Sequence, residues 1–222
     1  MFGTLISVRE GSYAAFASIV REAGGGDRID VKEFWEHWEE RNIAHYWEPY
    51  RRYREICELS LAETFEHFGM HGDAKLIARY FDAFPAFSLY RDVTETLDAL
   101  AKHYPLAVVS NIDDDLLALT RLGRSFEVVC TSERARGYKP DGTLFKYLID
   151  QVQPRLGASR NDILHCGQSQ FTDMVGAKPL GLRVAWINRR SVALSCHVPR
   201  PDHIFTDIAS VRSLVVGDAT FL

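Results

Sequence analysis

The sequence is poor in cysteine, and its cysteines form no closely spaced pair. Four are present, none of them in a CxxC arrangement: Cys57, Cys130, Cys166 and Cys196. This spacing argues against a zinc site and predicts reduced thiols in a cytoplasmic protein. The chain also lacks an apolar run long enough to cross a bilayer, and no basic segment followed by an apolar one opens it. We therefore expect neither a membrane-spanning helix nor a secretion signal.

A strong excess of one charge is missing as well. The formal net charge is -4, which gives no reason to expect nucleic acid or an anionic membrane surface as a partner. Hydrophobic residues make up 46% of the chain and charged residues 25%, as in ordinary soluble globular proteins. A length of 222 residues suits one domain, or a core with a smaller inserted domain.

Residues 12–86 are rich in aromatic and charged residues and show mostly helical spacing. Cys57, Leu61, Phe65 and Phe68 follow one another at steps of four, four and three, which places them on one face of a helix. The glycine-rich stretch 22–28 is not preceded by a strand or followed by GK[ST], so we interpret it as a connector rather than a phosphate loop.

From about residue 92 the pattern changes to strands alternating with helices. Asp92 and Glu95 are spaced as a capping box, and a helical stripe of Val93, Leu97, Leu100 and Tyr104 follows. Such alternation predicts an α/β fold with a doubly wound parallel sheet. The predicted strands are 105–111, 126–132, 162–168, 183–188 and 203–207, and the predicted helices are 113–122, 143–152 and 171–179.

Polar residues follow several of these strands. Ser110 and Asn111 end the first, Lys139 precedes the helix after the second, and Asp173 follows the third. Ligands of parallel sheets bind beyond the carboxyl ends of the strands, where these residues are expected to meet. A lysine beside neutral donors and a carboxylate predicts a site for a small anionic substrate.

Together these motifs resemble the haloacid dehalogenase (HAD) superfamily of hydrolases, and most closely its 2-haloacid dehalogenase branch. The resemblance rests on FGTL (2–5), VVSN (108–111), YKPDGTLF (138–145) and the stretch 165–190 that ends in WINRR. It implies a Rossmann-like HAD core formed by residues 1–11 and 87–222, with a helical cap domain inserted at 12–86.

The resemblance also implies a nucleophile that the sequence does not contain. In the family pattern, Asp-x-Phe-Gly-Thr-Leu, the aspartate ends the first, central strand and forms a covalent ester with the substrate. Here x is Met1, so the aspartate would precede it. We expect an upstream strand to carry it in the natural protein, because omitting a central strand leaves backbone groups of its neighbours unpaired. The chain without this aspartate is expected to be inactive; the alternative is a genuinely non-catalytic relative.

The remaining roles are carried over from the family residue by residue. The resemblance implies a catalytic set in which Thr4 donates a hydrogen bond near the nucleophile and Ser110 and Asn111 hold the oxygens of the substrate. Lys139 would neutralise negative charge, and Asp173 would orient Lys139 or water. The residues expected to line the substrate are Phe2, Gly3, Gln168 and Ser169.

Two departures argue against the phosphatase branches. Phe2 occupies the position of their second aspartate and cannot transfer protons, and Gln168 replaces the first acid of their GDxxxxD motif. Magnesium prefers charged oxygen ligands. We therefore predict that no cofactor is needed, although Asp173 is the residue that would bind Mg²⁺ if a metal were used.

Other departures concern the dehalogenase branch. Its halide-binding arginine follows a cap tryptophan, but Glu36 follows Trp35 and Glu39 follows Trp38. An arginine elsewhere in the cap would have to serve: Arg41, Arg51 or Arg52. The branch's tyrosine after the lysine is Phe145, and Gln168 and Gln170 replace a serine and an asparagine.

We predict a dehalogenase-type hydrolase, with a phosphatase acting on a small phosphate ester and a non-catalytic HAD-fold protein as alternatives. A homodimer is left open. His165 and Cys166 are interpreted as core residues of a strand. YRRYRE (50–55) is interpreted as a solvated helix face, with the alternative that one of its arginines binds a substrate carboxylate.

Overall fold

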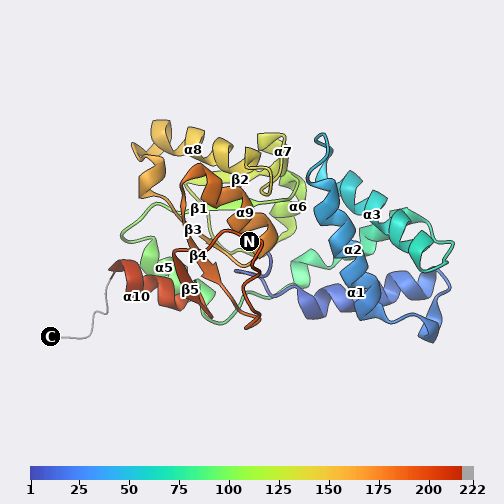
Figure 1. The fold of residues 1–222 in the computed structure, drawn as a ribbon. Helices are drawn as coiled ribbons and strands as arrows, with labels where there is room; N and C mark the ends of the chain where they lie inside the picture. The colour runs from blue at the N-terminus through green and yellow to red at the C-terminus, as the bar shows by residue number, and fades with distance from the viewer. Residues whose placement is uncertain (217–222) are drawn as a thin grey trace.

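The computed structural model describes residues 1–216, which form a helical part and an α/β part (Figure 1). The helical part consists mainly of α1 (Arg9–Glu22), α2 (Val31–His45), α3 (Tyr53–His67) and α4 (Ala78–Asp82). Helices α1, α2 and α3 lie together on one side of the molecule, away from the strands. No helix of residues 1–216 combines the length and apolarity needed to cross a bilayer.

Local sequence signals explain the helical part. The side chain of Asp30 accepts hydrogen bonds from the amides of Lys32 and Glu33 and so begins α2. On α3, Cys57, Leu61 and Phe65 of the predicted stripe are buried, whereas Phe68 lies just beyond the helix and is half-buried. The glycine-rich stretch 22–28 is a connector between α1 and α2.

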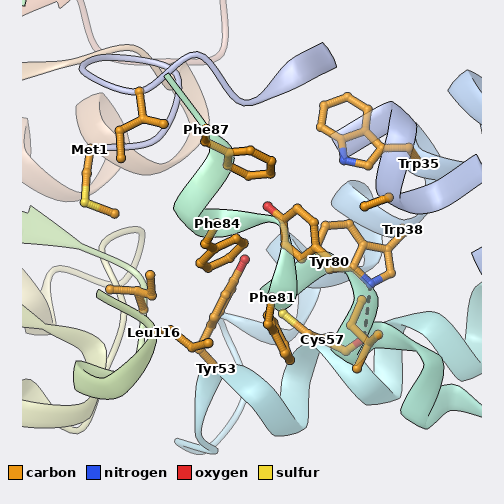
Figure 2. Close-up of a cluster of buried hydrophobic side chains, with 14 of the residues drawn as sticks. Met1, Trp35, Trp38, Tyr53, Cys57, Tyr80, Phe81, Phe84, Phe87 and Leu116 are labelled. Carbon is orange, nitrogen blue, oxygen red and sulfur yellow. Dashed lines mark hydrogen bonds between the residues drawn. The ribbon is translucent and has the colours of Figure 1, made fainter. Parts of the chain in front are cut away.

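An aromatic cluster fills the helical part and extends toward the α/β part (Figure 2). The rings of Phe16 and Trp38 have centroids 4.8 Å apart, and those of Tyr80 and Phe84 are 4.9 Å apart. Phe84 also meets Phe2 edge to face at 5.0 Å. Such aromatic pairs bury large apolar areas, so they join the opening loop of the chain to the helices.

The α/β part contains five parallel-paired strands among the described residues: β1 (Ala107–Ser110), β2 (Val128–Thr131), β3 (Leu164–Gly167), β4 (Arg183–Ile187) and β5 (His203–Phe205). They form a two-stranded sheet, β1-β2, and a three-stranded sheet, β3-β4-β5. The predicted α/β class with parallel strands is confirmed. Helices around the strands are α5 (Val93–Leu100), α6 (Asp114–Leu119), α7 (Ser132–Ala135), α8 (Thr143–Leu156), α9 (Val175–Ala177) and α10 (Ala209–Val216).

Two local predictions were wrong. Residues 171–179 do not form one helix: a π-helical turn over Gln170–Met174 leads into the short α9 and a 3₁₀ turn containing Pro179, which cannot donate a backbone hydrogen bond. Asp92 does not close a capping box at the start of α5, because its carboxylate binds Arg189 and the amide of Ile208 instead.

The stripe on α5 is shorter than predicted. Val93, Leu97 and Leu100 are buried, but Tyr104 lies beyond the end of the helix and is exposed. The helices α1 to α4 begin and end close to the predicted cap at 12–86, and the division into core and cap stays a prediction.

Candidate active site

The site is built around a buried ion pair between Lys139 and Asp173. The Lys139 Nζ lies 2.8 Å from Asp173 Oδ1, and both side chains are nearly inaccessible to solvent. Two glycines permit this approach. A Cβ atom on Gly167 would stand 2.4 Å from Asp173 Cγ, and one on Gly176 would stand 1.7 Å from the Lys139 carbonyl oxygen. Any side chain at either position would therefore push the pair apart.

Three donors hold the Asp173 carboxylate. Besides Lys139, the Nε2 of His165 lies 2.9 Å from Oδ1, and the amide of Ser169 donates to Oδ2 at 2.9 Å. Burial alone would raise the pKa of Asp173, but Lys139 and His165 outweigh burial and hold that pKa well below its usual range. Asp173 is therefore a fixed anion that orients Lys139.

The end of β1 lies at the same place. The Asn111 side-chain oxygen accepts a hydrogen bond from the Lys139 amide at 3.0 Å. Ser110 pairs with Thr131 across the sheet and is buried at the strand end. An ammonium has three N–H groups, and among residues 1–216 one of those of Lys139 goes to Asp173. Ser110, Asn111 and Lys139 thus offer donors of the kind that bind oxyanions.

The opening loop reaches this cluster from the other side. The α-amino group of Met1 is buried, and burial together with the nearby Lys139 lowers its pKa to about 5. Gly3 has a left-handed φ of 71° and its amide donates to the Ile6 carbonyl at 2.9 Å, which closes the turn. Thr4 is buried, whereas Phe2 packs on the aromatic cluster of Figure 2.

An arginine clamp that the sequence did not reveal fixes this loop. The Nε of Arg189 donates to the Thr4 carbonyl at 2.8 Å, and its two terminal nitrogens bind both oxygens of Asp92 at 3.0 and 2.9 Å. The guanidinium also lies 3.9 Å from the ring centre of Tyr90. Arg189 is therefore a positioning residue for the loop, and only its place in the WINRR ending hinted at a role.

Gln168 and Ser169 follow β3 at the predicted edge. The Gln168 backbone carbonyl accepts from the indole of Trp186 at 2.9 Å, and its side-chain oxygen accepts from Arg190 at 3.2 Å. The Ser169 hydroxyl accepts from the amide of Thr172 and so starts the π-helical turn that carries Asp173. Their predicted contacts with substrate stay a prediction.

His165 is another polar residue of the site whose role sequence reasoning missed. It was expected to be a core residue, and its ring does pack edge to face on Phe145 at 4.8 Å. Its contact with Asp173 depends on the turn after β3, which no sequence pattern announces. The neighbouring Cys166 is unsuited to be a nucleophile, because burial raises the pKa of its thiol to about 12.

The expectation that 50–55 forms a solvated helix face was wrong. Helix α3 begins only at Tyr53, which is buried, and Asp113 accepts hydrogen bonds from the amides of Tyr53 and Arg54 at 2.9 and 3.0 Å. The hydroxyl of Tyr138 donates to the Arg51 carbonyl at 2.9 Å. This segment is the junction between the helical part and the loops that carry Asn111 and Lys139.

The three arginines predicted as halide donors are all in ion pairs. Arg41 pairs with Glu63 at 2.6 Å, and Arg51 pairs with Glu48 at 2.8 Å. Arg52 lies 3.0 Å from Glu133 on the α/β part. None of these contacts brings a guanidinium to Lys139.

The described residues offer a poor magnesium site. Asp173 is the acid that the fourth motif retains, and both of its oxygens already accept hydrogen bonds from Lys139, His165 and Ser169. Gln168 brings a neutral oxygen that is bound to a guanidinium. Residues 1–216 contain no group of three or more His, Cys, Asp or Glu side chains able to hold a metal ion.

A parallel-stranded core with a lysine and a carboxylate at its strand ends defines an α/β protein with a polar site at the sheet edge. A family model described as haloacid dehalogenase-like hydrolase matches residues 3–187. The chain therefore belongs to the haloacid dehalogenase-like hydrolase family.

Relatives and solved structures agree with this assignment. An (S)-2-haloacid dehalogenase of Pseudomonas fluorescens is 23% identical, over 98% of this chain and 94% of the relative. The structure of L-2-haloacid dehalogenase from Xanthobacter autotrophicus with chloropropionic acid covalently bound has a TM-score of 0.78 at 22% identity, covering 98% and 96% of the two chains. A putative HAD-hydrolase from Bacillus subtilis bound to magnesium also has a TM-score of 0.78, at 15% identity and 97% and 96% coverage.

Proposed function

We propose that this hydrolase displaces the substituent of a small 2-substituted carboxylic acid, in a dehalogenase-type reaction that needs no metal. The observation that carries the proposal is the engagement of Asp173: Lys139, His165 and Ser169 occupy its oxygens, and Gln168 stands where a second acid would be needed for magnesium. The site therefore keeps an anion clamp and lacks what phosphoryl transfer requires.

The nucleophile of this proposal is an aspartate joined upstream of Met1, at the end of a strand of about five to six residues. The Met1 nitrogen, to which that residue would be attached, is buried beside Lys139 and Asp173. Within residues 1–216, β1 pairs only with β2 and β3 only with β4 among the strands. A parallel strand between β1 and β3 would satisfy both remaining edges and would deliver its last side chain to the clamp.

The proposed reaction has two steps. A carboxylate oxygen of the aspartate attacks C2 of the substrate, and the carbon–halogen bond breaks with its electron pair leaving on the halide. Water then adds to the ester carbonyl, the acyl–oxygen bond breaks, and the 2-hydroxy acid leaves while the aspartate is regenerated. Lys139, Ser110 and Asn111 bind the substrate carboxylate, and Asp173 with His165 holds Lys139 in place. Without the upstream aspartate, we expect no turnover.

The second candidate is a phosphatase acting on a small phosphate ester. The solved structure that motivates it is that of a HAD phosphatase from Thermococcus onnurineus, with a TM-score of 0.66 at 22% identity, whose likeness to this chain concerns the fold. Phe2, which the family resemblance aligns with the proton-transferring acid of the phosphatases, is an apolar ring that packs on Phe84 at 5.0 Å. The chemistry of these residues therefore favours displacement at carbon.

The test uses the chain extended by the upstream strand with its aspartate. The protein is treated with EDTA, and halide release from 2-chloropropionate is compared with phosphate release from p-nitrophenyl phosphate. We expect halide release that Lys139→Ala abolishes and that Lys178→Ala, a change at an exposed lysine pair, leaves intact. Phosphate release that requires added Mg²⁺, with no halide release, would assign the protein to the phosphatase branch.

A further inference from the structure

The arginines expected in the cap are engaged in ion pairs, but within residues 1–216 an arginine of the α/β part is not. Arg41, Arg51 and Arg52 are ion-paired with Glu63, Glu48 and Glu133. Arg189 is fixed by Asp92 and Thr4. Arg190 is different, because it is exposed and its hydrogen bond runs to a neutral side chain, that of Gln168.

We propose that Arg190, on the α/β part, is the arginine that receives the second small anion of the reaction. The inference rests on the proposed function in one respect: displacement handles two anions, the substrate carboxylate and the departing halide. Lys139 with Ser110 and Asn111 can clamp one of them. Arg190 offers a separate, permanently charged group for the other.

The turn that carries Arg190 is built to present it. The Asn188 side chain binds Val192 in both directions, accepting from its amide at 3.1 Å and donating to its carbonyl at 2.9 Å. Ser191 adopts a left-handed φ of 51°, which is unfavourable for a residue with a side chain. The preceding Arg189 is anchored on the opposite side. Such a braced turn holds the Arg190 backbone in place, so little order must be gained when a ligand binds.

The hydrogen bond of Arg190 points it at the reacting end of the site. Its Nη2 lies 3.2 Å from the Gln168 side-chain oxygen. That oxygen in turn lies against Gly3, because a Cβ atom built on Gly3 would stand 2.7 Å from it. Gly3 belongs to the loop that follows the expected nucleophile, and Gln168 occupies the position of a metal-binding acid in the phosphatases. Gln168 thus links the Arg190 guanidinium to the loop that follows the expected nucleophile.

The charge of Arg190 also acts on a carboxylate of the helical part. Glu39 of α2 is half-buried; burial raises its pKa, and Arg190 and Arg9 oppose that rise. Glu39 therefore competes with a bound anion for Arg190. Removing the Glu39 charge should therefore strengthen anion binding at Arg190, whereas removing the Arg190 charge should weaken it.

The experiment measures anion binding by calorimetry with the full 222-residue chain, which needs no turnover. The probes are propionate, an unreactive carboxylate, and bromide, so the two arms show which anion Arg190 takes. We expect Arg190→Gln to weaken binding of one probe by about tenfold, as for loss of a charge-assisted hydrogen bond, and Arg190→Lys to weaken it less. Glu39→Gln should tighten the same probe, and Arg200→Gln, at another exposed arginine, should leave both unchanged.

Three results would overturn the inference: unaltered affinity for both probes in Arg190→Gln, shifts of the same sign in Arg190→Gln and Glu39→Gln, or no saturable binding of either probe to the wild type. The proposed function fails separately. If the extended protein releases no halide while Arg190 still governs anion binding, the anion site stands and the reaction assignment falls. If halide is released at an unchanged rate and KM in Arg190→Gln, the reaction stands and the role of Arg190 falls.

Discussion

The helical part and the α/β part are held together by different chemistry. In the helical part, large aromatic side chains from α1 to α4 pack on one another, and Arg41 and Arg51 pair with glutamates of the same part. In the α/β part, the polar groups gather at strand ends, where Lys139, Asp173 and His165 satisfy one another away from water. Aromatic packing therefore stabilises the helical part, whereas the α/β part holds buried charged groups that can bind a substrate.

The largest expected effect tests the packing side of this comparison. Phe34 of α2 is fully buried, so Phe34→Ala is expected to lower the free energy of unfolding by about 3–5 kcal/mol, through lost burial and a cavity. Leu59→Ala, at an exposed position of α3, is the control and should cost under about 1 kcal/mol. Urea unfolding of both variants measures the difference; equal costs would show that the aromatic cluster does not hold the helical part together.

The next effect tests the charged side. Lys139→Ala leaves the buried Asp173 with His165 and the Ser169 amide alone, and is expected to cost about 3 kcal/mol of unfolding free energy. Lys178→Ala removes a lysine from an exposed pair with Asp202, 2.7 Å apart, and should cost under about 1 kcal/mol. Denaturant titration compares the two. Similar small losses would mean that solvent reaches the Lys139–Asp173 pair and that the site is not closed.

A third change tests the junction of the two parts. Asp113→Ala exposes the amides of Tyr53 and Arg54 at the start of α3 and should cost about 2 kcal/mol. Asp30→Ala removes an exposed cap of the same kind within the helical part, so about 1 kcal/mol is expected there. Thermal unfolding followed by circular dichroism distinguishes them. A smaller loss for Asp113 than for Asp30 would argue that α3 does not depend on the α/β part.

The smallest expected effect is a difference in how steeply the free energy of unfolding changes with pH. The folded pKa of Asp173 lies below its ordinary value of 3.8, so its contribution to stability is complete above that value and is lost as the pH falls further. Below about pH 4 the wild type should therefore lose about 1 kcal/mol per pH unit more than Asp173→Asn. Parallel slopes for the two proteins would mean that Asp173 titrates as an ordinary exposed carboxyl.

The sequence was most informative where a strand ends. Residues that follow parallel strands must meet at one edge, so Asn111, Lys139 and Asp173 could be expected to lie together, and hydrogen bonds connect them. The same reasoning could not find His165, because its partner depends on a π-helical turn. It also missed Asp113 and the Arg189–Asp92 pair, whose contacts join segments far apart in the chain. Asp92 illustrates the limit of local sequence patterns. Its spacing to Glu95 matched a capping box, but its carboxylate binds Arg189, which is distant in the sequence.

We propose that the strand-end cluster supports covalent catalysis by an aspartate joined upstream of Met1. A single turnover in water labelled with heavy oxygen tests it most directly, with the extended protein in excess over 2-chloropropionate. If water attacks an ester of the aspartate, the label enters the protein and the first hydroxy acid formed carries unlabelled oxygen at C2. Mass spectrometry of the product and of the peptide containing Phe2 and Gly3 reads both outcomes. Label in the hydroxyl group of the first product, with none in that peptide, would contradict the account.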